Sequence, residues 1–167
     1  MLKIIDVSGN MPFQVSVGVR KLADVVYAIV HHTAVPQDDQ PTIKRLQAMA
    51  KFHISKGWGH IAYHYVIDKE GYCYQCYRLE EIGAHAGEWN YNKESIGICF
   101  DGDYTKERLT ASQLHTYWEL LDYLCTRRPD MPRLISKSIK AHREVRPQPT
   151  ACPSDTIFNL VEAYRTL

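Results

Sequence analysis

The spacing of apolar and polar positions along the chain predicts several β-strands. Val25–Val30 and Ser95–Phe100 are near-continuous apolar runs of strand length, the pattern of strands buried on both faces. Ile61–Ile67 alternates with a period of two, and the turn Asp68–Gly71 separates it from a second short run, Tyr72–Tyr77. A strand, a turn ending in glycine and a second strand predict a hairpin.

Other segments carry apolar residues at helical spacing. Thr42 predicts an N-cap for a helix that runs to about Ile54, and Ser154 predicts one for a helix that ends near Arg165. Thr110 and Gln113 form a capping box ahead of a third helix. The apolar stripe of this third helix predicts a core-facing side. It consists of Leu114, Tyr117, Trp118, Leu121, Leu124 and Cys125.

Two shorter runs complete the pattern. Leu2–Val7 predicts an edge strand, and Ser138–Ala141 predicts a short strand that ends at His142. Strands that alternate with helices, with one hairpin, predict an α/β fold with a single mixed central β-sheet flanked by helices. We expect residues 1–24 to be an N-terminal extension that is part of the same domain.

Composition and charge narrow the class of protein. The 167 residues fit one domain, and a hydrophobic content of 45% indicates a globular chain. With 20 basic and 19 acidic residues the formal net charge is +1, so nothing suggests a nucleic-acid partner. No stretch approaches the ~20 apolar residues of a membrane span. The N-terminus lacks the apolar segment of a signal peptide, so we expect synthesis in the cytoplasm, with action elsewhere only after release.

The cysteines do not predict a disulfide scaffold, because five is an odd number in a chain without an export signal. Cys73 and Cys76 form a C-x-x-C pair, but they lie three apart in a predicted strand and therefore face opposite sides. We interpret both as small packing residues.

A metal site is suggested by His142 and Cys152. Imidazole and thiolate are the ligands that zinc takes most readily in proteins. Pro147 and Pro149 stiffen the loop between them. The apolar run Val25–Val30 also ends on histidines, at 31 and 32, and two strands lying side by side would bring the run-ends together. Adjacent strand residues face opposite ways, so at most one of these two histidines points at a shared site.

Four motifs in order carry a family resemblance. They are Val30–Thr33, Gly59–Ile67, Ser95–Ile98, and Ala141–Val145 with Ala151–Ser154. Together they resemble the zinc-dependent N-acetylmuramoyl-L-alanine amidases of the phage-lysozyme and peptidoglycan-recognition-protein type. The resemblance runs from about Val25 to the C-terminus, so residues 25–167 are expected to form the amidase domain, with a zinc-containing groove.

The resemblance implies the chemistry of this groove. It selects His31, with His142 and Cys152, as the ligands of a Zn²⁺ ion, which keeps an open fourth position as catalytic zinc does. The reaction implied is hydrolysis of the amide bond between N-acetylmuramic acid and L-alanine. Tyr63 matches the active-site tyrosine of the family, and Thr150 the position of a second transition-state donor.

The resemblance also implies the partners. His85 matches a position that lines the groove, while Trp58, Trp89 and Asn92 are candidates to bind sugar or peptide. The substrate would be peptidoglycan or a muropeptide. We expect a monomeric, bacteriolytic enzyme of phage or prophage origin, an endolysin that acts on the cell wall once released.

Three departures from the family keep alternatives open. The phage-lysozyme members have a lysine where Thr150 stands, and their loop between the last two ligands is shorter. Cys99 stands where cytosolic amidases that recycle muropeptides carry a glutamate, which weakens that alternative. A second alternative is a module that binds peptidoglycan without cutting it, but such relatives typically lose the cysteine ligand, and Cys152 is present.

Overall fold

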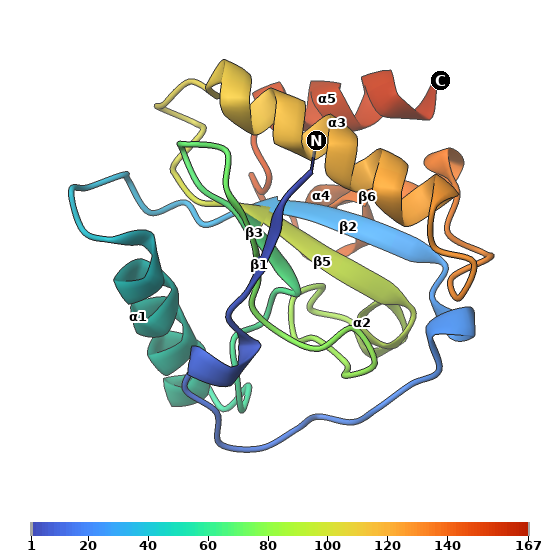
Figure 1. Ribbon diagram of the computed structural model, residues 1–167, viewed down its shortest axis with the longest axis horizontal. Coiled ribbons are helices and arrows are strands. Elements are labelled where there is room, and N and C mark those ends of the chain that lie inside the picture. Colours follow the sequence, from blue (N-terminus) through green and yellow to red (C-terminus); the bar gives the residue numbers. More distant parts are fainter. Residues whose placement is uncertain (1, 167) are drawn as a thin grey trace.

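The computed structural model describes residues 2–166. It contains six strands: β1 (Ile4–Asp6), β2 (Tyr27–His32), β3 (Tyr65–Ile67), β4 (Cys73–Gln75), β5 (Ser95–Phe100) and β6 (Ile139–Ala141). They form one sheet in the order β1-β4-β3-β5-β2-β6 (Figure 1). Only the β3–β4 hairpin is antiparallel, so the sheet is mixed, as the sequence predicts.

The two longest strands, β5 and β2, lie beside each other inside the sheet. All six residues of β5 are buried, and β2 is buried from Ala28 to His32. On its other side β2 pairs with β6, in a register that sets Val30 opposite Ala141. The two runs that end on histidine therefore do lie side by side.

Helices cover both faces of the sheet. They are α1 (Thr42–Ser55), α2 (Trp89–Lys93), α3 (Ala111–Thr126), α4 (His142–Val145) and α5 (Asp155–Arg165), with short 3-10 turns at Ser8–Asn10, Leu22–Asp24 and Ser136–Ser138. Figure 1 shows α3 and α5 packed over one face and α1 on the other side. Within residues 2–166, no helix combines the length and the apolar character needed to cross a membrane.

The core is divided by the sheet. The larger cluster joins β5 and β2 to α3 and α5, and it includes Tyr117, Leu121 and Val161. The smaller cluster joins the opposite face to α1 through Leu46 and Ala50. Cys73 belongs to the first cluster and Cys76 to the second, so the C-x-x-C pair does face opposite sides as packing residues.

Several predicted boundaries are wrong. The strand predicted over Ile61–Ile67 begins only at Tyr65, because the backbone before it binds other partners. The Ala62 amide donates to His53 Nδ1 at 3.0 Å, and the His64 amide donates to the Gly97 carbonyl at 3.0 Å. Tyr63 therefore lies in an irregular segment, which turns its side chain out of the strand alternation.

The ends of other elements also differ from the prediction. His142 does not close a strand but begins α4, where the Glu144 carboxylate accepts from the Ala141 amide. Residues 89–93, for which no helix is predicted, form α2, because the Glu88 side chain caps this short helix. Thr42 is the first helical residue rather than the cap, and its hydroxyl donates to Asp68 at 2.9 Å.

The stripe of α3 is also rotated from the prediction. Tyr117, Leu121 and Leu124 are buried as expected, whereas Leu114 and Trp118 are only partly buried and Leu120 takes a core position. The capping box of Thr110 and Gln113 is confirmed, as is the cap at Ser154.

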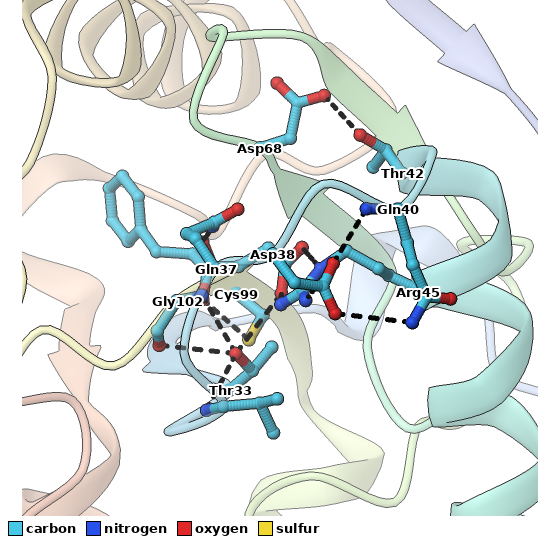
Figure 2. Close-up of polar contacts among 12 residues, drawn as sticks. Thr33, Gln37, Asp38, Gln40, Thr42, Arg45, Asp68, Cys99 and Gly102 are labelled. Carbon is cyan, nitrogen blue, oxygen red and sulfur yellow. Dashed lines mark hydrogen bonds and ion pairs between the residues drawn. The ribbon is translucent and has the colours of Figure 1, made fainter.

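Polar contacts fasten α1 and the preceding loop, residues 33–41, to the end of β5 (Figure 2). The Arg45 guanidinium donates to both carboxylate oxygens of Asp101, at 2.8 and 2.9 Å, and lies 3.0 Å from Asp38. Thr33 Oγ accepts from the Gly102 amide at 2.9 Å. These contacts hold the loop that leaves β2 directly after the two histidines.

Candidate functional site

Three side chains with metal-binding atoms meet at the end of β2. The ligand atoms of His31, His142 and Cys152 all lie within 4.8 Å of one another. The ring centroids of the two histidines are 4.5 Å apart, and Cys152 Sγ lies 3.8 Å from His31 Nδ1. The structure thus brings together the three residues that the sequence suggested as ligands.

The local fold explains this meeting. His31 is the second-to-last residue of β2, and His142 follows the paired strand β6 directly. The loop that carries Cys152 returns to the start of α4, where the Arg143 amide donates to the Cys152 carbonyl at 3.0 Å. The Arg143 side chain also donates to the Ala151 carbonyl at 3.0 Å. Backbone contacts therefore fix the thiol beside the two imidazoles.

The adjacent histidine takes the other face of the strand. His32 Nδ1 accepts from the Tyr104 amide at 3.3 Å, and its ring lies near the Tyr104 ring. Of the two, only His31 belongs to the cluster with His142 and Cys152, although His32 also borders the groove.

Burial sets the protonation of the three side chains. It is the main cause that lowers the pKa of His142 to about 4, and the positive charge of Arg146 adds to it. Burial also lowers the pKa of His31 well below its usual value, and it raises the pKa of the Cys152 thiol to about 12. Both imidazoles are therefore neutral at pH 7, with a lone pair to offer.

The residues present fit a zinc ion. Neither ring nitrogen of His142 makes a hydrogen bond of good geometry among residues 2–166, although the side chain is buried. A buried imidazole without a partner is unfavourable unless something else binds it. Two imidazoles and one thiol form a donor set that suits zinc, and they leave a fourth position for water or substrate.

Tyr63 stands against this cluster. Its ring centroid lies 5.1 Å from that of His31. Burial, followed by interactions with Cys99 and Cys152, raises the pKa of the Tyr63 phenol well above its usual value. The phenol therefore keeps its proton at neutral pH and can act as a hydrogen-bond donor. Cys99, which pairs with His31 across the two central strands, is a neighbour of this phenol rather than an acidic group.

His142 and Cys152 line a groove of about 500 Å³, and His31 lies buried beside it. The rest of its lining comes from His32, Trp58 and Tyr63, from several residues between 84 and 92, and from Arg146 and Thr150. Trp89 is 53% exposed and Trp58 38%, so both present open ring surface to a ligand. The groove contains every site residue that the sequence suggested apart from His31, which lies buried beside it.

Two of the suggested residues also have structural partners. Asn92 Oδ1 accepts from the His85 and Ala86 amides, at 2.9 and 2.8 Å, so this side chain shapes the loop. Thr150 Oγ accepts from the Cys152 amide at 3.2 Å, which leaves its hydroxyl proton available to the groove.

Sequence reasoning did not single out Arg146. It is the one lysine or arginine among the described residues that line the groove, and its side chain lies over Gly87. The acidic lining residue, Glu88, is engaged in capping α2. The signal available in the sequence was a cation four residues after His142, on the loop that leads to Cys152.

A second hollow of about 300 Å³ lies between α1 and residues 33–40. Tyr63 and His53 line it, together with apolar residues of α1 such as Met49 and Phe52. Because Tyr63 lines both hollows, they meet at this side chain.

Comparison with known proteins agrees with this geometry. A family model described as N-acetylmuramoyl-L-alanine amidase matches residues 21–155. Peptidoglycan-recognition protein SC2 of Drosophila melanogaster is 33% identical over 141 residues, which cover 83% of this chain and 73% of that protein.

Solved structures share the fold. Drosophila PGRP-LB superimposes with a TM-score of 0.82 at 25% identity, over 98% of this chain and 94% of its own. An endolysin, the N-acetylmuramoyl-L-alanine amidase LysCS from Clostridium intestinale URNW, has the same fold, with a TM-score of 0.75 at 23% identity, over 100% of this chain and 97% of its own.

Proposed function

The chain belongs to the N-acetylmuramoyl-L-alanine amidase family, and on this premise we propose that it is a zinc-dependent enzyme that cleaves peptidoglycan. The bond cleaved is the amide between N-acetylmuramic acid and L-alanine. One observation carries the proposal: the ligand atoms of His31, His142 and Cys152 converge within 4.8 Å beside an open groove. We propose these three residues as the zinc ligands.

Zinc bound there would supply Lewis acidity, polarising the scissile carbonyl and lowering the pKa of a water molecule to about 7. The protein's own groups would do the rest. Tyr63 holds its proton at neutral pH and is proposed to donate a hydrogen bond to the oxyanion that develops on the carbonyl. Thr150 is proposed as a second donor, since its oxygen is occupied by the Cys152 amide and its proton is free.

The remaining lining residues would hold the substrate. Trp58 and Trp89 expose ring surface on which a sugar or peptide can pack. Arg146 is the proposed partner of a carboxylate on the peptide stem, because no acidic side chain is paired with it in the described groove. His85 and Asn92 are proposed as lining residues that border the bound muropeptide.

We place the action of the enzyme on the cell wall, with an endolysin role as the most specific form of the proposal. The fold shared with an endolysin amidase is consistent with this role. The alternative is a module that binds peptidoglycan without cutting it. This alternative is suggested by the relatives that are named peptidoglycan-recognition proteins. The cysteine ligand and the protonated phenol beside it support catalysis over binding alone.

Digestion of purified sacculi with zinc-loaded protein distinguishes the amidase from the binding module. An amidase releases new L-alanine amino termini without new reducing sugar ends, and Cys152→Ser should abolish that release. Protein that pellets with sacculi while neither kind of end forms would replace the enzyme with the binding module.

A further inference from the structure

The metal-binding face of His31 depends on a contact on the opposite side of its ring. His31 Nε2 and His85 Nδ1 lie 3.0 Å apart, and the rings meet edge to face. A hydrogen bond between two ring nitrogens needs one protonated and one bare nitrogen. The direction of this bond therefore decides which nitrogen of His31 is left for a metal.

Ser95 settles that direction. Its hydroxyl donates to the Tyr91 carbonyl, which can only accept, so the hydroxyl proton is committed. His85 Nε2 lies 3.3 Å from the same hydroxyl oxygen, so Nε2 must carry a proton and donate it in this hydrogen bond. Neutral His85 then has a bare Nδ1, because a neutral imidazole carries one proton.

The consequence reaches the metal site. A bare His85 Nδ1 accepts from His31 Nε2–H, which leaves His31 Nδ1 without a proton. His31 Nδ1 is the atom that lies 3.8 Å from Cys152 Sγ. The Tyr91 carbonyl thus fixes the tautomer of His31 through the hydrogen bonds of Ser95 and His85.

The His85 ring is held rigidly in this position. A Cβ at Gly97 would lie 2.7 Å from its ring, and one at Gly83 would lie 2.8 Å from it, so two glycines provide the space. The His85 amide is bound by Asn92. A glycine inside a central strand weakens the strand, and here it admits the ring.

We propose that His85 is a positioning residue that, together with Ser95, holds His31 in the Nε2-protonated tautomer with Nδ1 directed at the metal position. The inference rests on the proposed metal site. It gives His85 a role that differs from contact with substrate, since both of its ring nitrogens are engaged within the protein. Outer groups of this kind typically change metal affinity by about 10–100-fold.

The tautomer can be measured without metal or substrate. Long-range ¹H–¹⁵N correlation spectra of the metal-free protein distinguish the two neutral forms of each imidazole. We expect His31 to be protonated at Nε2 alone in the wild type, and to become a mixture in Ser95→Ala. A wild-type His31 protonated at Nδ1 would overturn the proposal.

Metal affinity gives the second measurement, by competition with a chromophoric zinc chelator. Ser95 is fully buried and does not line the groove, so it cannot touch substrate. Ser95→Ala should weaken zinc binding about 3–10-fold, and His85→Leu about 10–100-fold. The zinc affinity of His85→Asn should lie between those of wild type and His85→Leu, because the asparagine side-chain carbonyl can accept from His31 Nε2–H.

Trp89→Ala is the matched groove control. It should raise the KM for muropeptides and leave zinc affinity unchanged. Ser95→Ala should weaken zinc binding, and so lower activity at subsaturating zinc, but leave the KM unchanged. Zinc affinity within twofold of wild type in both Ser95→Ala and His85→Leu would overturn the positioning role. If His85→Leu does not fold, Ser95→Ala decides. If the wild type binds no zinc, the proposed function fails, while the tautomer spectrum still tests the hydrogen-bond chain.

Discussion

At the scale of single residues, the site is a set of side chains whose own hydrogen bonds leave particular atoms free. His142 has two buried ring nitrogens that make no hydrogen bond of good geometry in the described chain, and Thr150 has a proton to donate. His31 has one nitrogen engaged and one directed at Cys152. Each of these free atoms identifies a place where a ligand would complete the polar contacts, and each can be tested by substitution.

Removal of one ligand is the first test. His142→Ala should weaken zinc binding by about two orders of magnitude or more, because two ligands hold zinc far less well than three. The metal-free variant should be less stable than metal-free wild type by about 1–3 kcal/mol, since a buried ring that packs against His31 is lost. Zinc competition and urea unfolding check the two expectations. His115→Ala, at an exposed position on α3, is the control. Retained zinc affinity in His142→Ala would remove His142 from the ligand set.

Arg146 offers a test of substrate charge. Arg146→Gln should raise the KM for muropeptides with free stem carboxylates by about tenfold, the effect of losing one partly exposed charge-assisted hydrogen bond. The kcat should change little, because the guanidinium is not among the groups proposed at the scissile carbonyl. Kinetics on substrates with free and amidated carboxylates measure this. Arg133→Gln, on the surface, is the control. An equal KM for both substrates in wild type would contradict the assignment.

Buried His53 predicts how stability depends on pH. Its Nδ1 accepts from the Ala62 amide, and burial, aided by the charge of His60, lowers its pKa to about 4. The unfolded chain, with a histidine pKa near 6.5, therefore binds more protons between about pH 6.5 and 4. Stability contributed by neutral His53 is complete above about pH 6.5 and is lost as the pH falls, by on the order of 3 kcal/mol at pH 4.

Urea unfolding at several pH values tests this expectation. The free energy of unfolding of wild type should fall more steeply below about pH 6.5 than that of His53→Gln, whose side chain does not titrate. Other buried histidines add to both curves, so the difference between the curves isolates His53. Parallel curves would show that His53 does not contribute.

At the scale of elements, α1 and the loop after β2 are held by a buried ion pair. The Asp101 side chain is 2% exposed and that of Arg45 8%, and the two form a bidentate contact. Breaking a buried pair leaves one charge without compensation, so Arg45→Met should lower the free energy of unfolding by about 3–5 kcal/mol.

A double-mutant cycle distinguishes the pair from simple loss of packing. Arg45→Met combined with Asp101→Asn removes both charges, so it should cost clearly less than the sum of the two single changes. Urea unfolding of the four proteins gives the coupling energy. Strict additivity would mean that the two side chains do not stabilise each other.

Sequence patterns predicted the elements better than their ends. The buried strands β2 and β5 were clear because apolar runs reflect burial, and the capping box before α3 is a local signal. The strand predicted over Ile61–Ile67 was too long, since its first half binds His53 and Gly97, which no local pattern reveals.

The site followed the same division. His31 and His142 could be predicted because each lies at the end of an apolar run, and Cys152 because it follows a proline-containing loop. The choice of His31 over His32 came from the family resemblance. Arg146 could not, because its importance depends on the Glu88 carboxylate capping α2 instead of pairing with it, and that is a property of the folded molecule. The partners of His85 depend likewise on Ser95 and on two glycines distant in sequence.

At the scale of the whole molecule, the N-terminal extension is built into the fold. β1 forms an edge of the sheet against β4, and Val7 and Met11 belong to the core cluster under α1. Arg20 is buried and donates to the carbonyls of Leu79 and of residues 92, 93 and 95. These carbonyls belong to the segments that carry His85 and Ser95, so we propose that residues 2–24 stabilise those segments as part of the same domain.

Arg20→Met tests this proposal, because it leaves several buried carbonyls without a donor. We expect a loss of about 3–5 kcal/mol in the free energy of unfolding, in a single cooperative transition of the whole chain. Val19→Ser, at a side chain that is 74% exposed, is the neighbouring control and should change stability by about 0.5 kcal/mol at most. If the extension were independent of the rest of the chain, Arg20→Met would not change the free energy of unfolding of the main transition. Deletion of the first 20 residues would then do the same, although it would expose β4 as a new sheet edge.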